Sequence, residues 1–113
     1  MRRGEVWVAN LNPNRGAEVG KVRPVLVLQA DSLIDSALAT VVVLPLTTRV
    51  RPDAAPLRVS LPARGDLREE SQVMVDQPRT VDKQRFGDGP LTALTTDEMT
   101  RVERSLRFLT GLA

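Results

Sequence analysis

The sequence contains no histidine and no cysteine among its 113 residues. Without histidine there is no Ser–His triad, no histidine-ligated zinc and no histidine pair for acid–base work on a phosphate. Without cysteine there is no disulfide framework and no thiolate metal site, which is typical of a reducing compartment. An enzyme of this composition has to use arginine, threonine, carboxylates or groups of its own substrate. We therefore expect no metal and no cofactor.

Aromatic residues make up only 3% of the chain, namely Trp7, Phe86 and Phe108. Stacking of bases on an aromatic platform is therefore not expected as a main binding device, and valine and leucine have to fill the core. No apolar run approaches the roughly 18 residues of a membrane span, and the charged N-terminus does not resemble a signal peptide. The sequence predicts a single domain over residues 1–113, located in the cytoplasm and without membrane contact.

The excess of positive charge is small. Sixteen basic residues are balanced by fourteen acidic ones, which leaves a net charge of +2, and fourteen of the basic residues are arginines. This bias reflects either the base composition of the genome or a need for phosphate recognition, since the guanidinium group is permanently cationic and presents a planar fork of donors. A site for a polyanion has to come from local clustering. The candidates are Arg15, Lys21, Arg23, Arg49, Arg51 and Arg79.

The first half of the chain predicts three strands. Residues 4–11 alternate between apolar and polar, whereas residues 24–29 and 40–46 are continuous valine and leucine runs that predict strands buried on both faces. A short helical turn is predicted at residues 31–38. Residues 47–56, with two prolines and three charges, predict a loop.

Two further short strands are predicted at residues 57–62 and 71–77, separated by a charged turn. In the second of these strands Val73 and Val75 alternate with polar residues. The alternation predicts that one face of this strand meets solvent or a partner.

The hydrophobic period changes near the C-terminus. Apolar side chains recur there at spacings of 3, 4 and 3 residues, which predicts one face of a helix: Met99, Val102, Leu106 and Leu109. Thr95 and Glu98 have the spacing of a capping box, and Gly111 is a suitable stop. The patterns together predict one terminal helix packed on a small, strongly bent sheet of five to seven short strands.

The most informative segment spans residues 3–28. It predicts a strand, a loop rich in glycine and charge, and a second strand that opens on Arg23 and Pro24. An arginine at the mouth of a strand, beside a charged loop, is a suitable anion site because its donors fit a phosphate group.

Ordered motifs extend over nearly the whole chain: RRGEVW, then Leu11, Pro13, Gly16 and Glu18, then KVRPVLVL, VVVLPLT and DQPRTVDKQR. In this order and spacing they resemble the MazF/PemK/Kid family of toxin endoribonucleases, the toxic halves of bacterial type II toxin–antitoxin pairs. The resemblance implies a mainly β, SH3-like barrel of five to seven short, mostly antiparallel strands with a C-terminal helix. It also implies a homodimer whose grooves bind single-stranded RNA, and a cognate MazE-like antitoxin.

The resemblance implies cleavage of mRNA at short sequence motifs without a metal, leaving a 2′,3′-cyclic phosphate and a 5′-hydroxyl. This chemistry suits a chain without histidine, because the 2′-hydroxyl of the RNA is itself the nucleophile. The protein then has to hold the phosphate in line, neutralise charge and move two protons. By resemblance, Arg23 matches the catalytic arginine, Thr47 the catalytic serine or threonine, and Glu18 a loop glutamate that acts as a base or orients Arg23.

The resemblance also implies RNA-binding residues. Asp76, Gln77 and Arg79 match a segment that lines the RNA groove. Met74 stands where the PemK/Kid branch has an arginine implicated in catalysis, so the version with Arg23 and Thr47, typical of the MazF branch, is expected instead. The remaining candidates for RNA binding are Asn12, Arg15, Lys21, Thr48, Arg49 and Gln72.

Three alternatives stay open at this point. One is a relic of the family that binds RNA or an antitoxin and has lost activity, against which the presence of Arg23 and Thr47 argues. From the residues alone, Arg23 is equally a structural arginine that pairs with Glu18 or Asp76 at the entry of a strand. A second function on the same barrel is that of the CcdB toxins, which poison DNA gyrase by protein binding and need neither Arg23 nor Thr47, because a fold does not determine a function. The CcdB toxins rely on a Trp-Gly end of their helix, whereas this chain ends FLTGLA.

Overall fold

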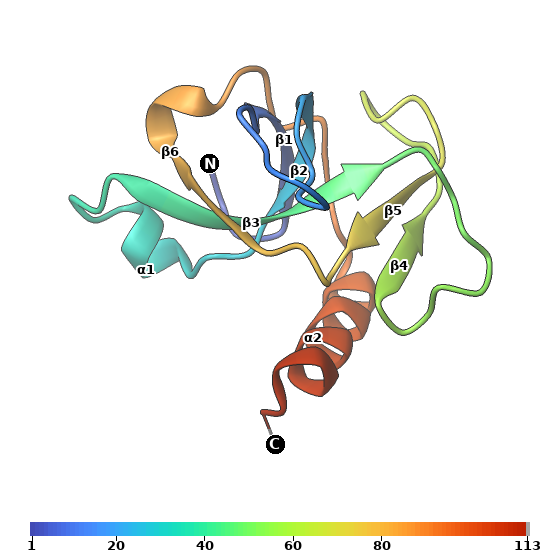
Figure 1. The fold of residues 1–113 in the computed structure, drawn as a ribbon. Coiled ribbons are helices and arrows are strands. Elements are labelled where there is room, and N and C mark those ends of the chain that lie inside the picture. The colour runs from blue at the N-terminus through green and yellow to red at the C-terminus, as the bar shows by residue number, and fades with distance from the viewer. Residues whose placement is uncertain (113) are drawn as a thin grey trace.

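The computed structural model describes residues 1–112, which form seven short strands, two α-helices and one turn of 3-10 helix (Figure 1). The strands make one curved sheet, and the longer helix lies at the C-terminal end of the chain. Neither α-helix within these residues has the length and apolar character that crossing a membrane requires.

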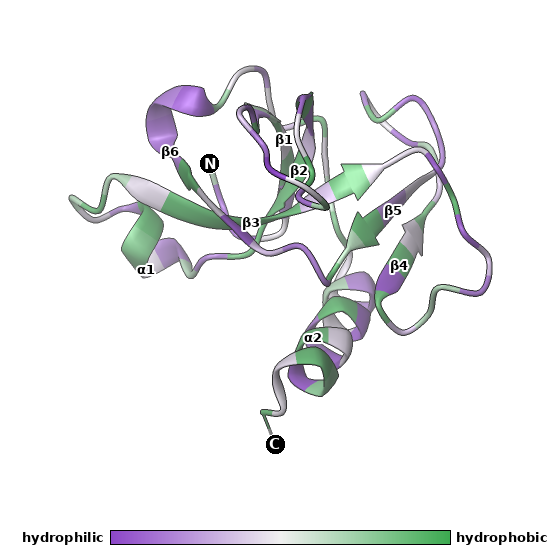
Figure 2. Cartoon of the chain, in the orientation of Figure 1, coloured by the Kyte–Doolittle hydropathy of each residue, from purple (hydrophilic) through white to green (hydrophobic). Residues whose placement is uncertain are grey.

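Three strands form the centre of the sheet: β1 (Glu5–Asn10), β2 (Val22–Val27) and β3 (Thr40–Thr47). They pair in chain order and antiparallel, which short connections allow. The continuous apolar runs of β2 and β3 are buried on both faces, as the sequence predicts, because consecutive residues are buried in each run, Val25 to Val27 in β2 and Val43 to Leu46 in β3. Figure 2 shows the hydrophobic residues concentrated along these two strands.

Strand β3 connects the two halves of the sheet. Its first residues pair with β6 (Arg79–Asp82), its middle with β2, and its last two with β5 (Ser71–Met74). Beyond β5 lies β4 (Arg58–Leu61), and the two-residue β7 (Thr92–Ala93) pairs with β1 at the other edge. The strand order is therefore β4-β5-β3-β2-β1-β7, with β6 beside β3, and the sheet curls into a half-barrel (Figure 1). This confirms the predicted class of a mainly antiparallel β fold with a C-terminal helix.

The sequence patterns did not predict β6 and β7 as strands. Only one of the four residues of β6, Val81, is buried, so the strand carries almost no periodic signal. After β6 the chain forms the 3-10 turn η1 (Lys83–Arg85), where the Asp82 carboxylate accepts a hydrogen bond from the Gln84 backbone.

The sheet buries apolar side chains on both faces, because successive residues of a strand point to opposite sides. One cluster lies between the sheet and α2 (Thr96–Thr110) and includes Leu26 and Val102. The other lies on the opposite face and includes Val25 and Val27, with Trp7 packed against it. Valine and leucine supply most of both clusters, as the scarcity of aromatic residues predicts.

Helix α2 begins and ends as predicted. The Thr95 hydroxyl accepts a hydrogen bond from the Glu98 backbone at 3.2 Å, and the Glu98 carboxylate accepts one from the Thr95 backbone at 2.9 Å. Gly111 closes the helix in the left-handed conformation. The predicted apolar stripe is wrong at Leu109, which is 38% exposed, because the last turns of α2 extend beyond the sheet (Figure 1).

The prediction that one face of the fifth strand meets solvent is also wrong. All four residues of β5 are buried, and the strand ends at Met74. The loop after β3 covers the polar side of β5: Gln72 accepts a hydrogen bond from the Arg51 backbone N–H at 2.9 Å and donates one to the Arg51 carbonyl at 3.0 Å.

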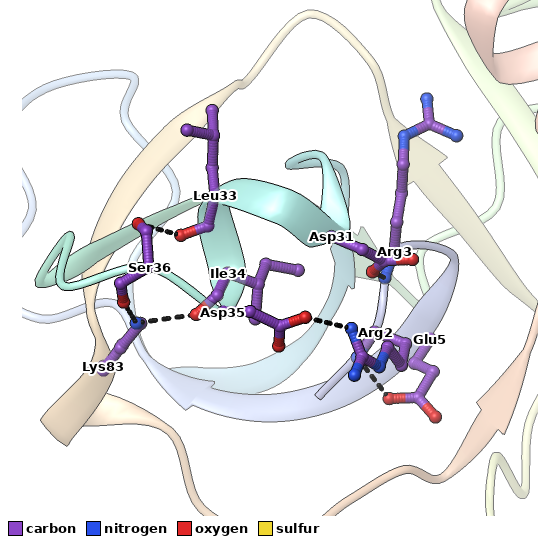
Figure 3. A network of polar contacts seen from close by, with 9 residues as sticks. All are labelled: Arg2, Arg3, Glu5, Asp31, Leu33, Ile34, Asp35, Ser36 and Lys83. Atoms are coloured by element: carbon purple, nitrogen blue, oxygen red, sulfur yellow. Dashed lines mark hydrogen bonds and ion pairs between the residues drawn. The ribbon is translucent and has the colours of Figure 1, made fainter.

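The predicted helical turn after β2 is present as the short helix α1 (Asp31–Ile34). A four-residue helix is not stable alone, so contacts from elsewhere have to hold it. Asp35, at its end, pairs with Arg2 at 2.7 Å, and the Lys83 ammonium donates to the Ile34 carbonyl at 2.9 Å (Figure 3).

Candidate active site

A cavity of about 550 Å³ opens where the start of β2 meets the end of β3. The loop between β1 and β2 forms one wall, and the first residues of the loop after β3 form another. Within the described residues, the lining includes four cationic side chains and no carboxylate. The main polar lining residues are Lys21, Arg23, Thr47, Thr48, Arg49 and Arg51. Such a concave, cationic surface favours a phosphate-bearing ligand.

The strand register brings Arg23 and Thr47 together. Val25 on β2 lies across from Pro45 on β3. Arg23 lies two residues before Val25, and Thr47 lies two residues after Pro45. Arg23 Nη1 donates to the carbonyl of Leu46, the residue before Thr47, at 3.4 Å, and both Arg23 and Thr47 line the cavity. The two residues that the resemblance pairs in catalysis therefore share one cavity.

The Arg23 side chain is half-buried and partly held by the backbone. Its Nε–H donates to the Gly20 carbonyl at 2.9 Å, and Nη1 donates to the Leu46 carbonyl at 3.4 Å. A guanidinium has five N–H donors, so three are left for a ligand in the cavity. Burial, and then the nearby Arg49 cation, lower the pKa of Arg23 from its ordinary value. The alternative of a salt bridge from Arg23 to Glu18 or Asp76 is not realised among the described residues.

Thr47 is oriented by the turn that follows it. Its hydroxyl oxygen accepts a hydrogen bond from the Arg49 backbone N–H at 3.1 Å. With the oxygen used as an acceptor, the hydroxyl proton is left to donate to a ligand. Thr47 can thus supply a neutral donor beside the charged donors of Arg23.

The cavity includes three of the predicted RNA-binding residues, Lys21, Thr48 and Arg49. Lys21 has a φ of 72°, which non-glycine residues seldom adopt, and strain of this kind is concentrated at functional sites. Glu18 does not line the cavity. Its carboxylate accepts a hydrogen bond from the Arg15 backbone at 2.9 Å, within its own loop.

Three predicted RNA-binding residues instead hold the loops around the cavity. The Asn12 amide oxygen accepts from the Lys21 backbone at 2.9 Å. Arg79 donates to the Val19 carbonyl at 2.7 Å and to the Leu11 carbonyl at 3.1 Å. Gln72 is buried beneath the Arg51 backbone, as described above. The remaining predicted residues, Arg15, Asp76 and Gln77, lie away from the cavity wall.

Sequence reasoning missed Ser71, and it named Arg51 as a candidate for a polyanion site but not among the RNA-binding residues that the resemblance implies. Both line the cavity. Arg51 was recognisable only as one of several clustered arginines. No sequence pattern marked Ser71 as a cavity residue, because its position depends on the pairing of β5 with the last two residues of β3.

A second cavity of about 480 Å³ adjoins the first and shares Pro24, Thr48 and Ser71 with it. Leu67 and Leu91 make part of its wall apolar. Asp66, Arg68 and Glu69 also line the second cavity, so it lacks the purely cationic character of the first.

Comparison with protein families identifies one match, to the PemK-like, MazF-like toxins of type II toxin–antitoxin systems, and it covers residues 2–110. The chain belongs to this family. Solved MazF structures share its fold. The toxin MazF-mt6 of Mycobacterium tuberculosis is 25% identical with a TM-score of 0.79, over 96% of this chain and 98% of that one. MazF of Deinococcus radiodurans is 26% identical with a TM-score of 0.81, over 98% of this chain and 96% of that one.

One relative in this MazF-like group was solved together with a partner. It is described as an endoribonuclease in complex with its cognate antitoxin from a mycobacterial species. It is 25% identical to this chain with a TM-score of 0.79, over 100% of this chain and 97% of that one. The agreement in length and fold covers the same part of the chain as the family match over residues 2–110.

Proposed function

We propose that this chain is the toxin of a type II toxin–antitoxin pair and that it cuts single-stranded RNA, chiefly mRNA, at short sequence motifs. The proposal rests mainly on one observation: Arg23 on β2 and Thr47 on the neighbouring strand β3 line the same cationic cavity. Family membership and the solved relative described as an endoribonuclease support it. Such a substrate would place the protein in the cytoplasm.

The proposed reaction uses the ribose of the RNA as the nucleophile. The 2′-oxygen forms a bond to the adjacent phosphorus, and the bond from phosphorus to the 5′-oxygen breaks. One proton leaves the 2′-hydroxyl and one reaches the departing 5′-oxygen, which gives a 2′,3′-cyclic phosphate and a 5′-hydroxyl. The reaction is a rearrangement at one phosphate, so it needs no covalent group from the protein.

In this scheme Arg23 stabilises the negative charge that develops on the non-bridging phosphate oxygens, because its free N–H donors are fixed in the cavity. Burial lowers the pKa of Arg23, which is the direction that makes proton exchange by this group easier. Thr47 donates its hydroxyl proton to a phosphate oxygen. We assign Glu18 no direct contact with the reacting atoms in this loop conformation, because its carboxylate is bonded to the Arg15 backbone.

Lys21, Arg49 and Arg51 bind the phosphates next to the cleaved one, because they are the other cations of the cavity. Thr48 and Ser71 lie where the two cavities join and are proposed to contact the neighbouring nucleotide. Arg15, Asp76 and Gln77 are proposed contacts for RNA that extends beyond the cavity.

We further propose a cognate MazE-like antitoxin and a homodimer. An antitoxin with an acidic segment is electrostatically complementary to the four cations of the cavity. A homodimer is supported by apolar surface at the end of α2, where Phe108 is 71% and Leu112 is 67% exposed.

The proposal is tested by incubating the pure protein with a long single-stranded RNA in excess EDTA and sequencing the new 5′ ends. We expect cuts at a short recurring motif, with 5′-hydroxyl ends, and no need for gyrase. An RNA with one 2′-deoxynucleotide immediately 5′ to a mapped cut should resist cleavage at that linkage alone. Intact RNA in the presence of pure protein, or unchanged cutting of the deoxy-substituted RNA, would contradict the proposal. A gyrase-dependent toxicity with intact RNA would favour the CcdB-like alternative.

A further inference from the structure

Arg79 holds the two ends of the loop between β1 and β2 together. It lies at the start of β6, and its guanidinium donates from Nη1 to the Val19 carbonyl at 2.7 Å and from Nη2 to the Leu11 carbonyl at 3.1 Å. These carbonyls belong to opposite ends of the loop. Hydrogen bonds from a charged donor are about twice as strong as neutral ones, so this clamp is stronger than the neutral backbone hydrogen bonds at the loop base.

The next carbonyl along the chain is the one that holds Arg23. The Gly20 carbonyl accepts the Nε–H of Arg23 at 2.9 Å. Arg79 therefore binds the carbonyl oxygen of Val19, and Arg23 binds that of the next residue, Gly20. Because each peptide unit is planar, the orientation of the Gly20 carbonyl follows from that of the Val19 carbonyl through only two dihedral angles.

The neighbouring side chains restrict the backbone between the Val19 and Gly20 carbonyls. Gly20 lies against the Asn14 side chain, which occupies the space where a Cβ would be. Lys21, the following residue, is held in the left-handed region, with its backbone N–H bonded to Asn12 at 2.9 Å. The segment from Val19 to Lys21 thus has few alternative conformations while Arg79 is in place.

Arg79 does not line the cavity, so its effect on a ligand there has to be indirect. We propose that Arg79 is a positioning residue for Arg23, which fixes the loop carbonyl that orients the Arg23 guanidinium toward the scissile phosphate. The inference rests on the proposed function and deepens it, because it assigns to Arg79 a part in catalysis other than contact with RNA.

A matched control is available in Arg85. Its Nη1 donates to the Asn12 carbonyl at 2.6 Å, so it also binds this loop through one backbone carbonyl and carries the same charge. It does not contact Val19 or Gly20. Loss of Arg85 therefore removes a charge and a loop contact but leaves the hydrogen bonds to the Val19 and Gly20 carbonyls in place.

The first readout does not depend on activity. The Arg23 Nε–H signal in a proton–nitrogen correlation spectrum, assigned with Arg23→Lys, should shift in Arg79→Gln and stay in place in Arg85→Gln. An unshifted signal in Arg79→Gln, or an equal shift in both variants, would overturn the inference whether or not the protein cuts RNA. If Arg79→Gln fails to fold, Arg79→Lys provides the same test, because an ammonium reaches one carbonyl but not both.

The second readout is kinetic. Misplacing a catalytic group by about 1 Å costs on the order of 10² in rate, so Arg79→Gln should lower kcat about 10- to 100-fold while KM changes less than about threefold. Arg79→Lys should recover part of this loss, and Arg85→Gln should stay within about threefold of the parent protein. A rise in KM with unchanged kcat would show that Arg79 contacts RNA directly and would overturn the positioning role. Absence of cleavage by the parent protein would contradict the proposed function and leave the spectroscopic test to decide the inference.

Discussion

Arg23 at the start of β2 and Thr47 at the end of the neighbouring antiparallel strand β3 line one cavity, and Arg23 Nη1 donates to the carbonyl of Leu46, the residue before Thr47, at 3.4 Å. Their placement follows from the ladder rather than from a loop, because Val25 and Pro45 fix the register two residues away. A pair of donors fixed by strands is held more exactly than a pair carried by loops. The other cations of the cavity, Lys21, Arg49 and Arg51, lie in the loops beside these strands and are proposed to bind the RNA along its length.

Replacement of Thr47 by valine keeps the size of the side chain and removes only the hydroxyl. If the hydroxyl donates to the phosphate, Thr47→Val lowers kcat by about 10²–10³ and Thr47→Ser retains most of the activity. Thr48→Val is the matched control, because Thr48 lines the same cavity but follows the end of β3. Single-turnover cleavage of a short RNA measures the three rates. An equal loss at Thr48 would contradict the assignment of the donor.

Neutralising Arg49 should weaken RNA binding and make it less dependent on salt. Each phosphate contact on single-stranded RNA contributes about 0.7 to the slope of log affinity against log salt concentration, so Arg49→Gln lowers that slope by about 0.7. Titrations in the inactive Thr47→Val background measure binding without cleavage. Arg104→Gln makes the same change of charge at an exposed position of α2 and should leave the slope unchanged. Equal effects of both variants would indicate that overall charge, and not the cavity, governs binding.

The ion pair between Arg64 and Glu98 should make stability depend on pH. The Nη1 and Nη2 atoms of Arg64 each donate to one oxygen of the Glu98 carboxylate at 2.7 Å. This hydrogen bonding is the main cause that lowers the pKa of Glu98 from 4.5 to about 2. Because the pKa is lower in the folded state, the stabilisation is complete above about pH 4.5 and is lost as the pH falls toward 2. A shift of this size corresponds to about 3 kcal/mol at neutral pH.

Denaturant unfolding at pH 7 and pH 3 tests this ion pair. Glu98→Gln should lower the free energy of unfolding at pH 7 by about 2–4 kcal/mol and should reduce the difference between the two pH values. Glu103→Gln is the control, since Glu103 pairs with Arg3 at 3.0 Å at a partly exposed site and should cost less than about 1 kcal/mol. An unchanged pH dependence in Glu98→Gln would show that other carboxylates are responsible.

The sequence predicts well those parts of the fold that have a strong periodic signal. The valine and leucine runs of β2 and β3 and the capping box of α2 are visible in the residues themselves, and all three are present in the structure. Strand β6 was missed because only Val81 of its four residues is buried. Its pairing with β3 is a long-range contact that no local pattern encodes.

The candidate site shows the same division. Arg23 and Thr47 were selected through the family resemblance, and both line one cavity, whereas their catalytic roles stay a prediction. Arg79 and Gln72 were expected to contact RNA, yet both bind backbone groups of loops that are distant in sequence. Whether a polar side chain faces a ligand or a carbonyl depends on the tertiary path of the loop, which composition and spacing do not contain.

Arg23 is proposed to act on the scissile phosphate within the cationic cavity. The most direct measurement is the rate at which pure Arg23→Ala cleaves single-stranded RNA in EDTA, with folding confirmed by its thermal unfolding curve. We expect the variant to stay folded and to lose at least about 10²-fold in rate, because it lacks the fixed donors that face the developing charge. A folded Arg23→Ala protein that cuts RNA at the rate of the parent protein would contradict the account.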